Sequence, residues 1–130
     1  MFDDIYRNKK VLITGHTGFK GTWMSLLLKE MGAKVCGFSL APETTPNHFD
    51  LLNLESNIKH VVGDIRDADA LNNAVQDFQP EFVFHLAAQA LVKESYTNPV
   101  STFDTNIMGS VNLLEEVRKC DSVRSLVYIT

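Results

Sequence analysis

Three glycines spaced three residues apart are the part of this sequence best suited to bind a ligand. Gly15, Gly18 and Gly21 directly follow the apolar run Val11 to Thr14, and an amphipathic segment begins at Phe19. Gly15 allows a tight turn, Gly18 leaves no side chain between the backbone and a bound pyrophosphate, and Gly21 permits close packing of helix on strand. The unpaired N–H groups and partial positive charge of a helix start would then face the phosphates. The segment therefore predicts a dinucleotide site.

Further residues could contact a dinucleotide, although each also has an ordinary structural explanation. Lys20 could neutralise phosphate charge or be a solvated surface lysine, and His16 is equally ambiguous. Asp64, just after an apolar run, could accept a hydrogen bond from an adenine amino group, or could stabilise a turn by bonding its own backbone. Ala87 and Ala88 are small, as a wall close to a ligand requires, yet two alanines are also common in a core.

The position that would bind the adenosine ribose departs from the usual dinucleotide pattern. An acidic residue is expected about 20 residues beyond the glycines, and Ser39 stands there instead. A serine hydroxyl can bond the ribose, although more weakly than a carboxylate does, and no arginine lies nearby in sequence to favour a 2′-phosphate. We therefore expect NAD rather than NADP.

Metal and acyl-transfer chemistry find no support in the sequence. The histidines and nearby carboxylates lack the repeated spacing of zinc or iron ligands, so no metal is expected. The residues considered are His48, His60, His85, Asp50 and Glu55. A Gly-x-Ser-x-Gly nucleophile motif is also absent from the sequence.

Composition and charge favour one globular domain. The chain has 130 residues, of which 45% are hydrophobic and 22% charged, and its net charge is −4 without a cluster of Lys and Arg. These values argue against disorder and against binding to nucleic acid or an anionic membrane. The longest uncharged stretch, Phe82 to Val92, is far shorter than the roughly 20 residues of a membrane span. Without a signal peptide, the expected location is the cytoplasm, with Cys36 and Cys120 reduced.

Strand-like apolar runs alternate with helix-like segments along the chain, which is the pattern of βαβ units around a parallel sheet. The runs are apolar throughout, as strands covered on both faces should be. Five strands are predicted: Val11 to Thr14, Lys34 to Leu40, His60 to Val62, Glu81 to Leu86 and Ser125 to Ile129. Three helices are predicted: Phe19 to Met31 with Gly32 as its stop, one capped by Asp67 and ended by Pro80, and one capped by Asn98 and ending near Lys119. One or two helical turns are predicted over His48 to Leu54.

The last predicted helix carries an apolar stripe and two residues that weaken helices. The stripe consists of Val100, Phe103, Ile107, Val111 and Leu114. It could pack on the sheet or form half of a helical bundle in a dimer. Asn106 and Gly109 lower helix propensity by roughly 0.5 and 1 kcal/mol relative to alanine, so another interaction must favour them.

The Gly-x-x-Gly-x-x-Gly spacing resembles that of extended short-chain dehydrogenase/reductases. Gly63 to Asp67 resembles the adenine-contacting turn of that family, Phe84 to Gln89 its segment beside the ribose and phosphates, and Asn106 with Gly109 to Glu115 its fourth-helix signature. These markers cover residues 11 to 130. The resemblance implies an α/β fold, with a Rossmann-type doubly wound parallel sheet of five strands in the order 3-2-1-4-5.

Within this superfamily, the combination of His16, Lys20 and Trp23 with Ala87-Ala88-Gln89-x-Leu-Val and Ser-Tyr-x-x-Pro is similar to CDP-glucose 4,6-dehydratases. The resemblance to dTDP-glucose dehydratases, GDP-mannose dehydratases and UDP-sugar epimerases is weaker at these positions. The resemblance to CDP-glucose 4,6-dehydratases implies that residues 1–130 form the N-terminal NAD(P)-binding part of a longer lyase. That enzyme would convert CDP-glucose to a 4-keto-6-deoxy sugar by transient NAD-mediated oxidation at C4, in deoxysugar and polysaccharide biosynthesis.

The resemblance also implies which residues contact the cofactor, with Asn106 holding a water or a backbone group. The implied contacts are Gly15, Thr17, Gly18, Phe19, Lys20, Gly21, Ser39, Asp64, Ile65, Leu86, Ala87, Ala88, Gln89 and Asn106. The family's acid/base groups and substrate domain follow Thr130, so no catalytic residue is assigned and this chain alone is expected to be inactive.

The sequence also leads to expectations about the oligomeric state and about alternative functions. The full-length protein is expected to be a homodimer acting on a small nucleotide sugar. The last strand would form a sheet edge, which predicts self-association of the chain. Another enzyme of the superfamily, such as an epimerase, and a non-catalytic dinucleotide-binding module are the alternatives.

Overall fold

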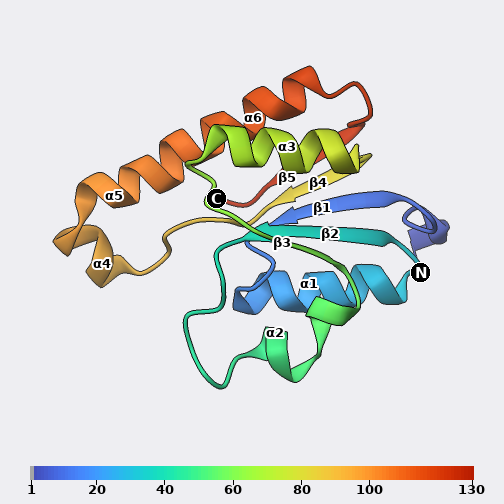
Figure 1. Cartoon of the computed structure of the whole chain (residues 1–130), viewed down its shortest axis with the longest axis horizontal. Helices are drawn as coiled ribbons and strands as arrows, with labels where there is room; N and C mark the ends of the chain where they lie inside the picture. Colours follow the sequence, from blue (N-terminus) through green and yellow to red (C-terminus); the bar gives the residue numbers. More distant parts are fainter. Residues whose placement is uncertain (1) are drawn as a thin grey trace.

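The structure, a computed structural model, describes residues 2–130 and is built around a five-stranded parallel sheet. Its strand order is β3-β2-β1-β4-β5 (Figure 1). The strands are β1 (Lys10–Thr14), β2 (Lys34–Ser39), β3 (Lys59–Val62), β4 (Phe82–His85) and β5 (Ser125–Tyr128). The predicted α/β class, Rossmann-type sheet and strand order are confirmed, and each strand boundary lies within one residue of its predicted position.

Helices cover both faces of the sheet. The helices α1 (Phe19–Glu30) and α2 (His48–Leu51) lie on one side, and α3 (Ala68–Phe78) lies on the other. Beside α3 runs a long helix over residues 99–119, which consists of α5 (Pro99–Phe103), a π-helical turn η3 (Asp104–Met108) and α6 (Gly109–Lys119) (Figure 1). The remaining short elements are η1 (Phe2–Asp4), η2 (Leu54–Ser56) and α4 (Val92–Thr97).

Alternating side chains of the central strands form two hydrophobic cores. On β1, Val11 and Ile13 pack toward α1, whereas Leu12 packs toward α3 and α6, and all three are fully buried. Burying each such side chain contributes roughly 1.5–3 kcal/mol. Both faces of the strand are therefore apolar, which explains why its sequence shows an unbroken hydrophobic run.

Local signals set the ends of two helices as predicted. The Asp67 carboxylate accepts a hydrogen bond from the Ala70 backbone N–H at 3.0 Å, which caps α3. Past the end of α1, Gly32 adopts a φ of +83°, a left-handed conformation that glycine allows at no steric cost.

The predicted start of the long helix is confirmed, with Asn98 at the N-cap position and Pro99 as the first helical residue, but the Asn98 side chain does not cap the helix. The short helix α4, which was not predicted, ends immediately before this residue, and the Asn98 amide donates to the Glu94 carboxylate within that helix. Only the Asn98 backbone carbonyl serves the following helix, by accepting from the Thr102 N–H at 3.1 Å.

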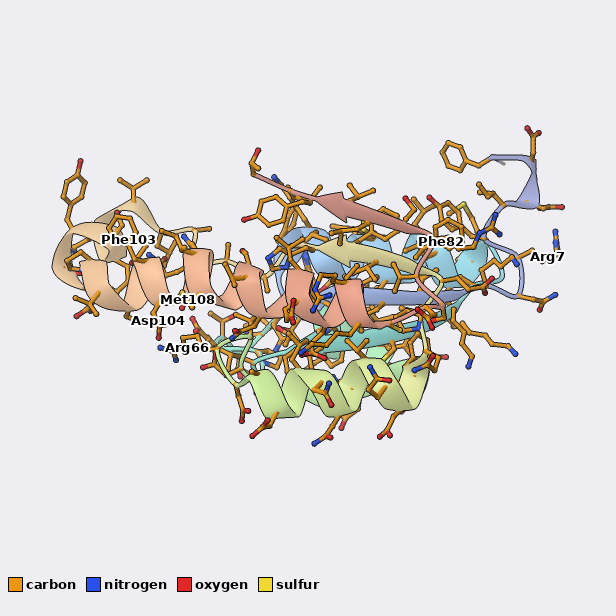
Figure 2. All side chains as sticks on the ribbon, turned by 90° about the horizontal axis from the view of Figure 1, so that it is seen from above. Arg7, Arg66, Phe82, Phe103, Asp104 and Met108 are labelled. Atoms are coloured by element: carbon orange, nitrogen blue, oxygen red, sulfur yellow. The ribbon has the colours of Figure 1, made fainter. Side chains whose placement is uncertain are left out.

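The apolar stripe of the long helix does not pack on the sheet, so that alternative is wrong. The side facing the core carries the fully buried Leu113, whereas the stripe points away from it. Figure 2 shows Phe103 and Met108 on the part of the helix that projects past the strands. The exposed apolar residues on the helix are Val100, Phe103, Ile107, Met108, Val111 and Leu114.

The described residues 2–130 contain no helix with the length and apolar character that crossing a bilayer requires. Within the same range, no three His, Cys, Asp or Glu side chains are grouped as metal ligands would be. Cys36 and Cys120 are buried free thiols, and burial raises the pKa of Cys36 to about 11.

Candidate functional site

A crevice of about 560 Å³ opens where the strands end at their carboxyl side. Its walls are the turn after β1, the loop after β2, the turn after β3 and the segment after β4, with Thr105 from the long helix. From β1 the chain builds the sheet outward through β2 and β3, and then crosses to β4 on the other side of β1. The switch point therefore lies between β1 and β4, and ligands of open parallel sheets bind at such a point. The volume lies within the roughly 300–1,000 Å³ of small-molecule sites.

Two of the three glycines are required by the packing of the protein itself. Gly15 has a φ of +78°, and a Cβ there would lie 2.8 Å from the Ala87 nitrogen. A Cβ at Gly21 would lie only 2.1 Å from the Gly15 carbonyl oxygen. Both positions therefore exclude any side chain: Gly15 because the turn touches the backbone after β4, and Gly21 because the first turn of α1 touches the glycine turn.

Gly18 differs, because the fold leaves room for a side chain there. Its φ is −72°, and the nearest atom to a Cβ at this position would be the Gly15 oxygen at an ordinary 3.4 Å. Gly18 lines the crevice and precedes α1, whose start has no side-chain cap. The free amides of this helix start and the open space above Gly18 fit an anionic group such as a diphosphate.

The end of β2 presents a hydroxyl with free lone pairs. The Thr17 hydroxyl donates to the Leu40 carbonyl at 2.9 Å, and its oxygen lies 2.8 Å from Ser39 Oγ. Because the Thr17 proton is already used, the Ser39 hydroxyl donates to Thr17 and its own oxygen remains an acceptor. Ser39 can therefore accept a hydrogen bond from a ribose hydroxyl.

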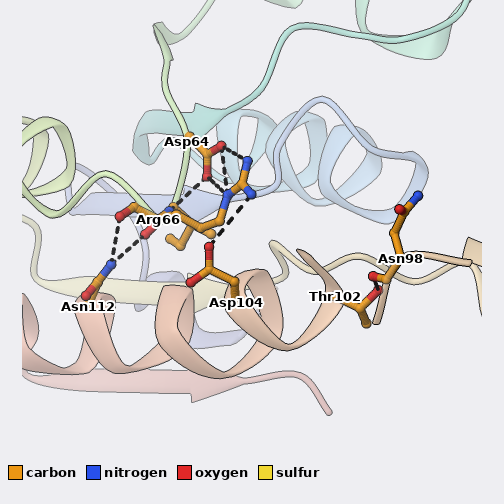
Figure 3. A network of polar contacts seen from close by, with 7 residues as sticks. Asp64, Arg66, Asn98, Thr102, Asp104 and Asn112 are labelled. Carbon is orange, nitrogen blue, oxygen red and sulfur yellow. Dashed lines mark hydrogen bonds and ion pairs between the residues drawn. The ribbon is translucent and has the colours of Figure 1, made fainter. Parts of the chain in front are cut away.

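Asp64 is held by Arg66 in the turn after β3. One Asp64 oxygen accepts from the Arg66 backbone N–H at 2.9 Å, and the other lies 2.6 Å from the guanidinium (Figure 3). The guanidinium also lies 3.8 Å from the Asp104 carboxylate on the long helix. Hydrogen bonds from Arg66 lower the pKa of Asp64, so the carboxylate stays ionised. The turn-stabilising explanation of Asp64 is thus correct, and Asp64 also lines the crevice.

Asn106 and Gly109, on the long helix, contact the segments after β4 and β3 that border the crevice. The Asn106 side chain accepts from the Gln89 N–H at 2.7 Å and donates to the Gln89 carbonyl at 3.0 Å. A Cβ at Gly109 would lie 2.4 Å from the Ile65 side chain. These two contacts explain residues that weaken a helix, and Asn106 holds a backbone group as the resemblance implied.

The crevice brings together most of the implied cofactor contacts. Those that line it are Gly15, Thr17, Gly18, Phe19, Ser39, Asp64, Ile65, Leu86, Ala87 and Ala88. Four others do not line it: Gly21 lies under the turn, Gln89 and Asn106 bond each other, and Lys20 is exposed in the first turn of α1.

His16 is a core residue and does not line the crevice. Its ring is fully buried against Gly37, where a Cβ would lie 2.1 Å from His16 Cγ, and its Nε2 lies 2.7 Å from His60 Nδ1. Burial, together with the neighbouring His60, lowers the pKa of His16 to about 4, so the ring is neutral near pH 7. The sequence left this role open, and the structure assigns it to packing.

Sequence reasoning missed several crevice residues. Arg66 was not singled out, although its position two residues after Asp64 was a usable signal for a carboxylate-holding arginine. The loop after β2 also lines the crevice through Glu43 and Asn47, as does His48 at the start of α2, and no local pattern indicated that this segment borders the site.

Comparisons with known proteins agree with this geometry. Residues 12–130 match the family model described as GDP-mannose 4,6 dehydratase. CDP-glucose 4,6-dehydratase of Salmonella typhimurium is 46% identical over 127 residues, which cover 98% of this chain and 35% of that protein. The chain therefore spans about a third of the length of this curated relative.

Solved structures of UDP-glucose 4-epimerases are also similar. The Thermus thermophilus enzyme in complex with NAD has a TM-score of 0.79 and 32% identity, over 90% of this chain and 36% of its own. The Stenotrophomonas maltophila enzyme with bound NAD has a TM-score of 0.77 and 28% identity, over 92% of this chain and 36% of its own.

Proposed function

The chain belongs to the family described as GDP-mannose 4,6 dehydratase, and from this membership we propose that it is the NAD-binding part of a longer CDP-glucose 4,6-dehydratase. The observation that carries the proposal is the glycine turn, in which Gly18 leaves open a space that the fold itself does not need. The 46% identity to a CDP-glucose 4,6-dehydratase supports the choice of substrate.

The crevice residues have distinct roles in this proposal. The amides that follow Gly18 face the diphosphate, Ser39 accepts from the adenosine ribose, and Asp64 and Ile65 contact the adenine. NAD, when bound, supplies the acceptor and later the donor of a hydride. The protein contributes the position of the dinucleotide and the shape of its wall.

Charges in the crevice support NAD over NADP. Among the described residues that line it, Arg66 is the sole Arg or Lys, and its guanidinium is shared between Asp64 and Asp104. A 2′-phosphate would therefore compete with two carboxylates for one cation, whereas a 2′-hydroxyl needs only the free acceptor of Ser39.

Catalysis and assembly belong to the longer protein in this proposal. No acid/base group is assigned to residues 1–130, so we expect this chain alone to bind the cofactor without turnover. The exposed apolar side of the long helix supports a homodimer, since contiguous apolar surface of this kind marks interaction sites. Family membership supports a cytoplasmic location.

The test is product analysis with the complete protein. The proposal predicts that incubation with CDP-glucose and NAD⁺ yields CDP-4-keto-6-deoxyglucose, observed by NMR of the nucleotide sugar. A CDP-hexose with one inverted hydroxyl would instead identify an epimerase. NAD⁺ binding without conversion of CDP-, dTDP- or GDP-sugars would identify a non-catalytic module.

A further inference from the structure

A chain of hydrogen bonds behind the crevice joins the ends of three strands to the long helix. His85, at the end of β4, is buried, with Nδ1 2.6 Å from Thr14 Oγ1 and Nε2 2.9 Å from Ser110 Oγ. Ser110 Oγ also lies 2.7 Å from the Asn106 carbonyl and 2.9 Å from the Tyr128 hydroxyl at the end of β5. The three side chains His85, Ser110 and Tyr128 lie outside the crevice lining.

The direction of every hydrogen bond in this chain follows from the available donors. Thr14 Oγ1 accepts from the N–H groups of Leu86 and Ala87, both at 3.2 Å, so its own proton goes to His85 Nδ1. His85 is therefore neutral, carries its proton on Nε2 and donates to Ser110. Ser110 donates to a carbonyl, which can only accept, so the Tyr128 hydroxyl must donate to Ser110.

Both ends of this network hold the wall that follows β4. Thr14 binds the backbone of Leu86 and Ala87, two residues that line the crevice. At the other end, the Asn106 side chain binds both backbone groups of Gln89. A change at Tyr128 therefore reaches the crevice through Ser110, either by way of His85 and Thr14 or by way of Asn106.

We propose that Tyr128, Ser110 and neutral His85 are positioning residues that hold the wall over residues 86–89 in the geometry that binds the dinucleotide. The inference rests on the proposed NAD site and adds residues that touch no cofactor. Hydrogen-bonded networks of this kind fix a single arrangement only when every member is satisfied. Loss of one hydroxyl therefore loosens the wall without changing any atom of the crevice surface.

Two substitutions test the network by titration calorimetry of the chain with NAD⁺. Tyr128→Phe removes one hydrogen bond and is expected to weaken NAD⁺ binding between about twofold and tenfold, the range given by the net contribution of one hydrogen bond. Ser110→Ala removes three hydrogen bonds and leaves the His85 Nε2 proton without its acceptor, so it is expected to weaken NAD⁺ binding more than Tyr128→Phe does. Ser110→Thr keeps the hydroxyl and is expected to restore the affinity. If Ser110 acts only through packing, the smaller alanine would be tolerated better than threonine, which is the opposite order.

A control variant and a spectroscopic signature complete the test. Tyr6→Phe also removes a tyrosine hydroxyl, but at the opposite end of the sheet, where Tyr6 packs on Phe82 and Phe84. This variant is expected to leave NAD⁺ affinity unchanged. Nitrogen-15 NMR of the chain without cofactor is expected to show His85 protonated on Nε2 alone.

Different results would overturn the positioning role and the NAD site. Wild-type affinity in both Tyr128→Phe and Ser110→Ala, or a proton on His85 Nδ1, overturns the positioning role while the NAD site stands. A folded wild-type chain that binds no NAD⁺ overturns the proposed function, and with it the role assigned to these residues.

Discussion

The two glycines at the start of α1 are expected to respond differently to the same added methyl group. Gly18→Ala places the methyl in the open space of the crevice, with the Gly15 oxygen at 3.4 Å. Gly21→Ala places it 2.1 Å from that same oxygen and 2.7 Å from His16 Cα. The first change should therefore affect the ligand, and the second should affect the protein.

The magnitudes follow from these distances. Gly18 has a φ that alanine adopts freely, and exchanging glycine for alanine at a helix start changes the free energy of unfolding by no more than about 1 kcal/mol. Gly21→Ala requires the start of α1 to move by about 1.3 Å, from 2.1 Å to the 3.4 Å of ordinary contact. Overpacking of this kind costs about 1–3 kcal/mol or more.

Denaturant unfolding followed by circular dichroism and calorimetry with NAD⁺ measure the two effects separately. If the methyl of Gly18→Ala costs a similar 1–3 kcal/mol against the bound diphosphate, NAD⁺ affinity falls by about 5-fold to 150-fold while stability is retained. Gly21→Ala should lose both stability and NAD⁺ affinity. Wild-type NAD⁺ affinity in Gly18→Ala would refute the assignment of the diphosphate to this turn.

Three further outcomes are expected. Because the pKa of His16 is lowered to about 4 in the folded state, the unfolded chain binds a proton first as pH falls below 6.5, and stability is lost between pH 6.5 and pH 4. The expected loss in the free energy of unfolding is about 3 kcal/mol. Urea unfolding of the wild type and of His16→Gln across this pH range should show this loss as the difference between the two proteins, because their carboxylates titrate alike. Parallel plots of stability against pH would contradict the prediction. Ser39→Asp should strengthen NAD⁺ binding up to about tenfold, since a charged acceptor bonds a ribose hydroxyl more strongly than a neutral one does. An unchanged or lower affinity in calorimetry would count against the ribose contact. Phe103→Glu should weaken the self-association that passes through the long helix, observed as a lower average mass in size-exclusion chromatography with light scattering, while pairing along the edge of β5 would persist. An average mass equal to that of the wild type would contradict an interface on the long helix.

Sequence reasoning was most successful where one segment carries its own signal. The apolar runs located the central strands within a residue because these strands are buried on both faces, as Val11, Leu12 and Ile13 are. The edge strands β3 and β5 were located equally well, although their residues are only partly buried or exposed. The glycine spacing located the turn because Gly15 and Gly21 meet a backbone that no other residue could tolerate. Asp67 capped its helix because capping depends only on residues three positions apart.

Features that depend on distant segments could not be predicted in the same way. Arg66 bridges two carboxylates, one of which, Asp104, lies far along the chain, and the network of His85 and Tyr128 draws on several elements. The helix α4 buries no residue, so its apolar pattern is weak. For the stripe on the long helix, periodicity showed that one side is apolar but not what covers it.

The most direct test of the account is an NMR titration of the isotopically labelled chain with NAD⁺. The backbone amides of Gly18, Phe19, Lys20 and Gly21 should show the largest shifts, because the diphosphate would sit on the start of α1. The predicted result is that the shifts of these amides saturate with NAD⁺, and that saturation of the same helix start in Gly18→Ala requires about 5-fold to 150-fold more NAD⁺. Largest shifts elsewhere in the chain, with these four amides unmoved, would contradict the central claim.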